Sequence, residues 1–190
     1  MRPGGITIAL WIGFALSWAV AAWWSSPPAS VLGMRREAPS RILLLLGGIL
    51  FFIPAHGYDG PLRLWFPSWW LAWLSVVLII SGFAFSWWAR IELGSLWSAN
   101  ITRKPGHEVI DRGAFAIVRH PIYTGILLAV FGTLLVKGTI LGIIGALLIA
   151  IGLWLKARLE ESWLSQELDA SAYEAYRKHV PMLIPFGPKG

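Results

Sequence analysis

The alternation of apolar and polar segments predicts an all-α integral membrane protein with about five transmembrane helices. The apolar segments are Ile6–Trp24, Ile42–Ile53, Ser68–Trp88, Ile122–Val136 and Ile140–Leu155. Because about 20 helical residues are needed to cross the ~30 Å hydrocarbon core, the first and third segments are long enough on their own. The second is short, and spans only if flanking side chains such as Arg41 reach the headgroups.

The spans fall into two predicted units, residues 1–93 with three helices and residues 94–190 with two. The second unit opens with a long polar loop, Ser95–Arg112, which is long enough to have a function of its own. Its two spans are separated only by Lys137-Gly138-Thr139. So short a connection predicts that the last two spans form a helical hairpin.

Composition and charge support a membrane protein and predict its orientation. The chain is 56% hydrophobic and 14% charged, whereas soluble domains are nearer ~25% charged. Five spans place every lysine and arginine on one side except Arg2, Arg63 and Lys137. Short basic loops stay cytosolic, so this side and the C-terminus are predicted to face the cytosol. The bases form no stripe typical of nucleic-acid binding, and the absence of cysteine excludes disulfides and a thiol nucleophile.

One short segment, GAFAIVRHPIYTG from Gly113 to Gly125, crowds polar, aromatic and glycine residues in front of the fourth span. Charged and polar groups are costly near hydrocarbon, so Arg119-His120-Pro121 at this point indicates function. Pro121 suits a first helical turn, which does not use its missing N–H. His120 would then lie at the N-cap, where the helix dipole favours anions. The segment therefore predicts a ligand site at the membrane end of a helix.

A second polar cluster, KARLEESWL from Lys156 to Leu164, directly follows the fifth span. Residues three or four apart share a helix face, so Arg158 would neighbour Glu161 and Lys156 would neighbour Glu160. These pairs alone fit a helix that leaves the membrane with its charges paired among themselves. The hairpin, however, delivers the cluster to the same side as Arg119, so we expect the two clusters to touch.

The last part of the chain predicts a cytosolic helix. Ser171 and Glu174 have the spacing of a capping box, and Pro181 ends the helical pattern. Tyr173, Tyr176 and Val180 have helical spacing and share one face of this helix. Such a helix would lie on the membrane interface or cover a pocket from the cytosolic side.

Together these motifs resemble the isoprenylcysteine carboxyl methyltransferase family, which shares its C-terminal half with the phospholipid N-methyltransferases. The resemblance covers residues 94–186 and is carried by Gly113-x-Phe115-x-x-x-Arg119-His120-Pro121-x-Tyr123-x-Gly125, Arg158-x-Glu160-Glu161-x-x-Leu164 and Tyr173-x-x-Tyr176. It implies S-adenosylmethionine in a cytosolic pocket walled by the last two spans, the preceding loop and the C-terminal helix. A lipid or prenylated substrate would enter from the bilayer.

Carried over by position, the resemblance implies a cofactor pocket lined or shaped by His107, Val109, Gly113, His120, Pro121, Tyr123, Glu160 and Leu164. It assigns catalytic roles to Arg158, Glu161 and Arg119, which would organise the acids or face the substrate. The family motif often has tyrosine where this chain has Phe115, so a hydroxyl contact there is lost. No metal is implied, and the four histidines show no paired ligand spacing.

These features predict an integral membrane methyltransferase that acts on a lipid or lipid-modified substrate, first of all the carboxylate of an isoprenylcysteine-like molecule. A carboxylate substrate needs no deprotonation before methyl transfer, and Arg158 could orient it. An amine substrate would instead require an acidic residue or an aromatic cage. Both are present, so a phospholipid N-methyltransferase is an alternative. An NADPH-dependent sterol-type reductase would need more bases, and the chain lacks a glycine-rich dinucleotide fingerprint. A membrane scaffold would leave Arg119-His120 and the two glutamates unexplained.

Overall fold

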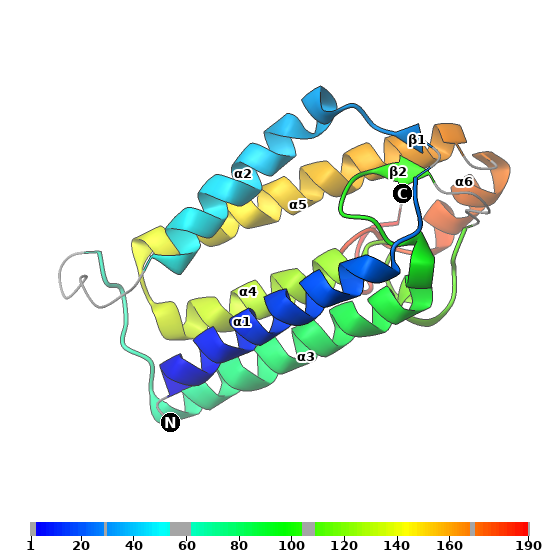
Figure 1. Ribbon diagram of the computed structural model, residues 1–190. Coiled ribbons are helices and arrows are strands. Elements are labelled where there is room, and N and C mark those ends of the chain that lie inside the picture. Colours follow the sequence, from blue (N-terminus) through cyan, green and yellow to red (C-terminus); the bar gives the residue numbers. More distant parts are fainter. Residues whose placement is uncertain (1–2, 29, 54–61, 104–108, 168–169, 190) are drawn as a thin grey trace.

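The computed structural model describes residues 3–28, 30–53, 62–103, 109–167 and 170–189, which are mostly helical (Figure 1). The long helices are α1 (Pro3–Ala21), α2 (Met34–Phe52), α3 (Trp69–Leu93), α4 (Pro121–Lys137) and α5 (Ile140–Glu167), followed by the shorter α6 (Ala170–His179). Short 3-10 turns lie at η1 (Ala22–Trp24), η3 (Gly94–Leu96) and η4 (Gly113–Ala116). Strands β1 (Ser30–Val31) and β2 (Thr102–Arg103) pair antiparallel. The predicted all-α class is confirmed.

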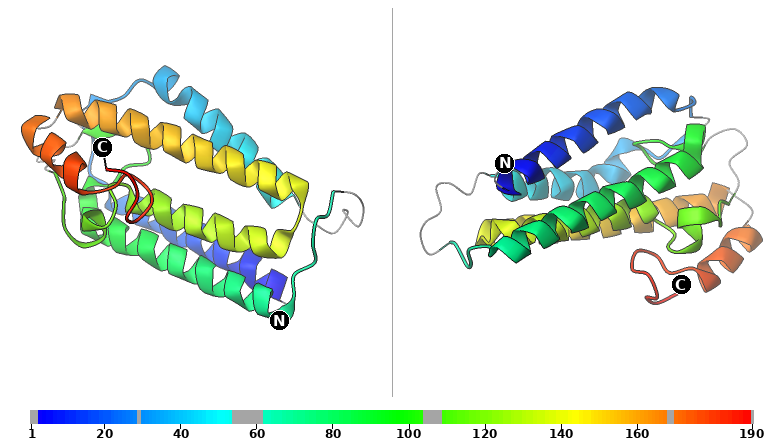
Figure 2. Two further views of the ribbon diagram at one scale, coloured as in Figure 1. Left: turned by 180° about the vertical axis from the view of Figure 1, so that it is seen from behind. Right: turned by 90° about the horizontal axis from the view of Figure 1, so that it is seen from below.

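Two helix pairs build the frame, and glycines let their backbones approach closely. Where α3 crosses α4, a Cβ placed on Gly82 would collide with the carbonyl of Gly125. Where α2 crosses α5, a Cβ placed on Gly47 would lie 2.9 Å from the carbonyl oxygen of Gly145. Small residues at crossings of this kind are typical of helices packed in a membrane. Helix α1 packs on α3, so α1, α3 and α4 lie on one side of the molecule and the α2–α5 pair on the other (Figures 1 and 2).

A buried apolar cluster joins the two groups of helices. It consists of Phe51 from α2, Val130 from α4, and Ile149 and Leu153 from α5. Helices α4 and α5 follow each other directly, because Gly138 adopts a left-handed conformation (φ 57°) that ends α4 and turns the chain.

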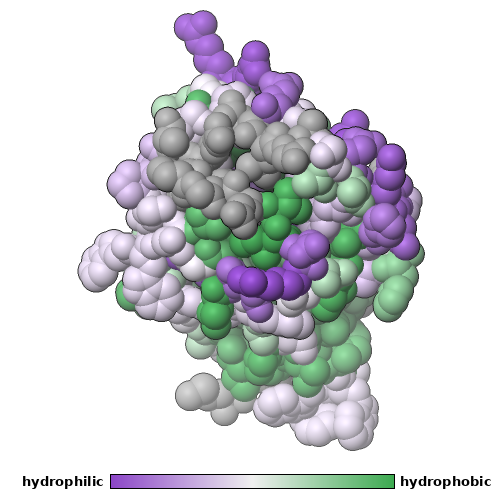
Figure 3. All heavy atoms as spheres, turned by 90° about the vertical axis from the view of Figure 1, so that its right-hand side faces the viewer, coloured by the Kyte–Doolittle hydropathy of each residue, from purple (hydrophilic) through white to green (hydrophobic). Residues whose placement is uncertain are grey.

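One end of the bundle carries most of the polar chemistry. The C-terminal ends of α1, α3 and α5 and the N-terminal ends of α2 and α4 all lie there, together with α6 (Figure 1). Viewed from this end, hydrophilic side chains stand around hydrophobic ones (Figure 3). Arg63 and Lys137 belong to the opposite end, where α3 begins and α4 ends.

Among the residues that the structure describes, three helical segments are long and apolar enough to cross a membrane: Gly4–Trp24, Trp69–Leu96 and Ile140–Gln166. They correspond to the first, third and fifth predicted spans. Helix α4 is apolar but shorter, and α2 carries several charged residues in its first turns. That α2 and α4 also span the membrane stays a prediction.

Several helix boundaries differ from the predicted ones, because the prediction followed apolar residues alone. Helix α2 begins at Met34, eight residues before the apolar run, and its polar start is stabilised by Glu37 pairing with Arg41. Helix α5 continues through the second polar cluster to Glu167 without a break. Helix α6 already begins at Ala170, so Ser171 lies inside the helix rather than at its N-cap.

Candidate functional site

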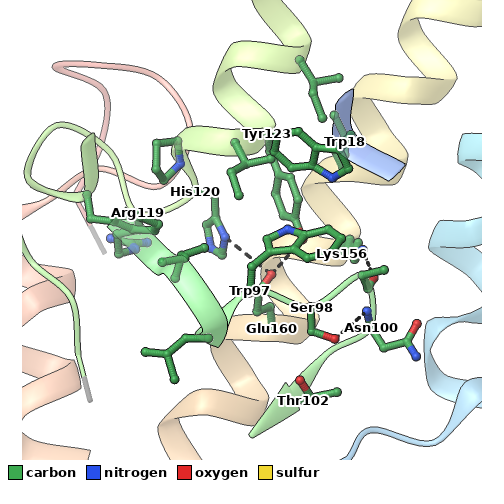
Figure 4. Close-up of a pocket in the computed structure, with 18 of the residues that line it drawn as sticks. Trp18, Trp97, Ser98, Asn100, Thr102, Arg119, His120, Tyr123, Lys156 and Glu160 are labelled. Atoms are coloured by element: carbon green, nitrogen blue, oxygen red, sulfur yellow. Dashed lines mark hydrogen bonds and ion pairs between the residues drawn. The ribbon is translucent and has the colours of Figure 1, made fainter. Parts of the chain in front are cut away.

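A cavity of about 690 Å³ opens at the polar end of the bundle and extends between the helices. Its polar part is lined by Tyr173 and Tyr176 of α6 and by residues labelled in Figure 4: Trp97, Ser98, Asn100, Thr102, Arg119, His120, Tyr123, Lys156 and Glu160. Its apolar part is lined by Trp11, Phe14, Ala15, Trp18, Ala19, Leu44, Ile126, Ile149 and Leu153. One space therefore joins a charged cluster to an apolar arm between the helices.

The start of α4 brings the first predicted motif to the cavity. His120 is the N-cap of α4 and Pro121 its first residue, as the sequence predicts. The backbone N–H of Arg119 donates to the carbonyl of Pro181 at 2.9 Å, and that of His120 donates to the carbonyl of Met182 at 3.1 Å. The chain that follows α6 thus holds this motif in place along its backbone.

Glu161 is the buried centre of the site, with only 5% of its surface exposed. Its Oε1 accepts a hydrogen bond from Nε of Arg119 at 2.6 Å and lies 3.2 Å from Nε2 of His120. Arg119 also donates to the carbonyls of Arg177 (3.0 Å) and Val180 (2.6 Å). The guanidinium of Arg119 and the carboxylate of Glu161 neutralise each other's charge. Because the same carboxylate oxygen also contacts Nε2 of His120, the pair fixes the orientation of the His120 ring.

Glu160, the next residue, lines the cavity instead. Its Oε2 accepts a hydrogen bond from the hydroxyl of Tyr123 at 2.9 Å and lies 3.8 Å from Nδ1 of His120. The Tyr123 ring is parallel to the His120 ring at 5.4 Å, and Nζ of Lys156 lies 5.7 Å from its centroid. Figure 4 shows these four side chains around one space. They offer a ligand a carboxylate, an ammonium group and aromatic surfaces.

A buried carboxylate on α2 holds the loop that covers this space. Glu37 is 1% exposed, accepts the backbone N–H of Ile101 at 3.1 Å and pairs with Nη2 of Arg41 at 2.8 Å. The same Nη2 donates to Oδ1 of Asn100 at 2.8 Å. Nζ of Lys156 donates to the carbonyl of Ala99 at 2.8 Å. The loop is therefore tied to both α2 and α5.

Helix α6 closes the site from the polar end, as the sequence predicts for a covering helix. Tyr173, Tyr176 and Val180 form a buried cluster with Val109 and Leu164. The hydroxyl of Tyr176 donates to the carbonyl of Phe115 at 2.7 Å. Burial raises the pKa of both tyrosines well above the usual value, so their hydroxyls stay protonated at neutral pH.

The structure brings most of the predicted residues to the cavity. Those that line it are Val109, Arg119, His120, Pro121, Tyr123, Glu160 and Leu164. Gly113 is not among the lining residues and forms a turn with φ 58°. His107 lies outside the described residues. The expected contact between the two polar clusters is present in the Arg119–Glu161 pair.

The structure places Arg158 on an exposed face of α5. Its side chain is exposed on α5, with the guanidinium 5.7 Å from the ring centroid of Trp154, and it is not among the residues that line the cavity. Glu161, which the sequence paired with Arg158, is paired with Arg119 instead. The base of this helix that lines the cavity is Lys156.

Sequence reasoning missed the contribution of α1. Its lining residues Trp11, Phe14, Ala15, Trp18 and Ala19 follow the spacing of one helix face. Because the whole segment is apolar, this face carries no polar signal that separates it from lipid-facing residues. Glu37, a lone acid among bases, was missed as well.

Comparison with known proteins agrees with the resemblance. Residues 74–166 match the isoprenylcysteine carboxyl methyltransferase (ICMT) family. The chain is 32% identical over 106 residues to protein-S-isoprenylcysteine O-methyltransferase of Schizosaccharomyces pombe, which covers 53% of this chain and 43% of that protein. It is 28% identical over 124 residues to protein-S-isoprenylcysteine O-methyltransferase B of Arabidopsis thaliana, covering 62% and 61%. An uncharacterized protein of Bacillus subtilis is 32% identical over 63 residues, 33% of this chain and 36% of that protein. The chain thus matches less than two thirds of the length of each of these relatives.

Proposed function

We propose that the protein methylates a lipid-modified carboxylate, with S-adenosylmethionine as the methyl donor, because residues 74–166 match the isoprenylcysteine carboxyl methyltransferase family. The observation that carries the proposal is the single cavity in which a charged cluster continues into an apolar arm. An amphipathic acceptor places its reacting head in the first part and its hydrocarbon chain in the second. The cavity volume falls within the range of about 300–1,000 Å³ common for small-molecule sites.

The residues of the polar part fit S-adenosylmethionine. The Glu160 carboxylate can accept hydrogen bonds from the donor's ammonium group or ribose hydroxyls, and it lies beside Tyr123. The Tyr123 and Trp97 rings offer faces for a sulfonium or an adenine, and a cation over such a face gains about 1–2 kcal/mol when water is excluded. When bound, S-adenosylmethionine supplies an electrophilic methyl group, so the site needs alignment more than a strong base.

We propose that Lys156 binds the carboxylate of the methyl acceptor. Among the described residues that line the cavity, the bases are Arg119, His120 and Lys156. Arg119 donates to Glu161 and to two carbonyls, whereas Nζ of Lys156 donates to one acceptor among the described residues, the carbonyl of Ala99. An ammonium group has three donors, so Lys156 has capacity left for a carboxylate. It would fill the role that the sequence suggested for Arg158.

Glu161 and Arg119 act as positioning residues in this proposal. Their buried pair holds the His120 ring against Tyr123, and through Tyr123 it sets the position of Glu160. The two glutamates therefore have different tasks, one toward the ligand and one toward the protein. The gathering of bases at this end supports a cytosolic orientation of the site and of the C-terminus.

The alternative acceptor is an amine, which Glu160 would favour and Lys156 would oppose. The test is methyl transfer by the protein in lipid nanodiscs, supplied with S-adenosylmethionine and either N-acetyl-S-farnesyl-L-cysteine or a phosphatidylethanolamine. Mass-spectrometric detection of the methyl ester alone supports the proposal. Methylation of the amine alone identifies a phospholipid N-methyltransferase, and no product from either acceptor overturns the proposed reaction on these classes.

A further inference from the structure

The apolar arm of the cavity has a limited length. On α5 the lining residues extend from Leu164 back to Ile149, which is about 22 Å along the helix at 1.5 Å per residue. On α1 the lining residue furthest from the polar end is Trp11, and on α4 it is Ile126. The arm therefore ends inside the bundle at the level of these residues.

Trp11 is held across the end of the arm by three neighbouring helices. Its Nε1 donates to Oγ1 of the buried Thr133 on α4 at 2.8 Å. Its ring meets Phe52 of α2 edge-to-face at 5.1 Å and Phe83 of α3 at 4.9 Å. A hydrogen bond and two aromatic contacts fix the indole, so it cannot turn aside without losing all three.

The space behind Trp11 is filled. The cluster around Phe51 (1% exposed) and Val130 (4% exposed) occupies the middle of the bundle, with Leu134 and Ala146 packed against it. None of these four side chains lines the cavity. A chain that enters the arm from the polar end meets a fixed indole and then a packed core.

We propose that Trp11 sets the longest hydrocarbon chain that the protein accepts. The inference rests on the proposed function, because it takes the acceptor's chain to occupy the arm. Each methylene buried in the arm raises affinity about fourfold. Once the hydrocarbon chain reaches the indole of Trp11, further methylenes cannot be buried in the arm and the affinity no longer rises. Affinity plotted against chain length therefore has a break, and the side chain at position 11 determines where it lies.

The test uses N-acetyl-S-alkyl-L-cysteines with linear chains of increasing length and the protein in lipid nanodiscs. Equilibrium binding and the kcat/KM of methyl transfer are measured for each chain. In the Trp11→Ala variant we expect the break to move to longer chains, with about 15-fold tighter binding of chains two methylenes beyond the original break. Trp11→Phe keeps an aromatic ring between Phe52 and Phe83, so it should shift the break by fewer methylenes than Trp11→Ala. This variant replaces Trp11→Ala in the test if the alanine variant does not fold.

Trp18→Ala is the matched control. Trp18 also lines the cavity, but it lies nearer the polar end, 5.7 Å from the Trp97 ring. Its loss should weaken binding of every chain by a similar factor and leave the break in place. A break that stays put in both Trp11 variants, or that moves equally with Trp18→Ala, overturns the proposal.

The two readouts separate this inference from the proposed function. If binding shows the break and its shift but no methyl ester forms, Trp11 limits chain length and the proposed reaction is wrong. If methyl ester forms and the break does not respond to Trp11, the proposed reaction stands and the role of Trp11 is wrong.

Discussion

Glu160 and Glu161 are adjacent in the chain but face different surroundings. Glu161 is buried, with its Oε1 2.6 Å from Nε of Arg119, while Glu160 lines the cavity and accepts a hydrogen bond from Tyr123 at 2.9 Å. Successive residues on a helix are about 100° apart, so one of two adjacent acids can face the protein while the other faces a ligand. Mutations of these two residues should therefore have different consequences.

Glu160→Gln should weaken cofactor binding, whereas Glu161→Gln should weaken the fold. Loss of a charge-assisted hydrogen bond to the ligand costs about 1.5–3 kcal/mol, which is roughly 10–100-fold in the affinity for S-adenosylhomocysteine. Removing the countercharge of the buried Arg119 costs about 3–5 kcal/mol of stability. Calorimetric titration and thermal unfolding of both variants measure the two effects. The reverse ranking would mean that the helix presents Glu161 to the ligand.

His120→Ala should lower the affinity for S-adenosylhomocysteine at least about tenfold while the protein stays folded. The ring stacks on Tyr123 at the cavity, and Glu161 keeps Arg119 as its partner in the variant. His179→Ala is a matched control, because His179 is exposed on α6 and does not line the cavity. A thermal-shift titration with S-adenosylhomocysteine measures the affinity of both variants. Undiminished affinity in His120→Ala would contradict the assignment of this cavity as the cofactor pocket.

Lys156→Ala should raise the KM for a carboxylate acceptor about tenfold or more, since one charge-assisted hydrogen bond is lost. Arg158→Ala, two residues away on the exposed face, should leave KM nearly unchanged. Steady-state kinetics with N-acetyl-S-farnesyl-L-cysteine compares the two variants. If Arg158→Ala impairs turnover and Lys156→Ala does not, the role predicted from the sequence is right. A loss of S-adenosylhomocysteine affinity in Lys156→Ala would place the lysine at the cofactor instead.

Gly125→Ala should destabilise the bundle by about 1–3 kcal/mol, because the added methyl group would collide with the backbone of Gly82 and force α3 and α4 apart. Gly13→Ala on α1 meets no atom within 4 Å and serves as the control. Thermal unfolding in detergent compares the variants. Equal stability of the two would show that the close helix contact contributes little.

The sequence indicated the polar core of the site because its residues are unusual near a membrane. Arg119-His120-Pro121 and the two glutamates stand out against apolar surroundings, and the short connection between α4 and α5 brings them to one end. Which acid faces the cavity could not be predicted, because it depends on the rotation of α5 about its axis. The partner of Arg158 was mistaken because spacing within one helix favoured Glu161, whereas Glu161 pairs with Arg119, which lies just before α4.

The apolar half of the cavity could not be predicted from the sequence. Trp11 and Leu44 belong to segments in which nearly every residue is apolar, so hydrophobicity does not separate the face toward the cavity from the face toward lipid. Their positions depend on how α1 and α2 pack against α3 and α5. Glu37 was likewise hidden in a basic segment, because its contact with the backbone of Ile101 joins residues far apart in the sequence.

The central claim is that the polar part of the cavity binds S-adenosylmethionine, and calorimetric titration tests it most directly. Purified protein in detergent is titrated with S-adenosylhomocysteine and, in parallel, with NADPH. We expect saturable binding of S-adenosylhomocysteine, weakened at least about tenfold in His120→Ala, and no binding of NADPH. Binding of NADPH alone would contradict the account and assign the protein to the reductases. Binding of neither ligand, repeated in lipid nanodiscs, would contradict it as well.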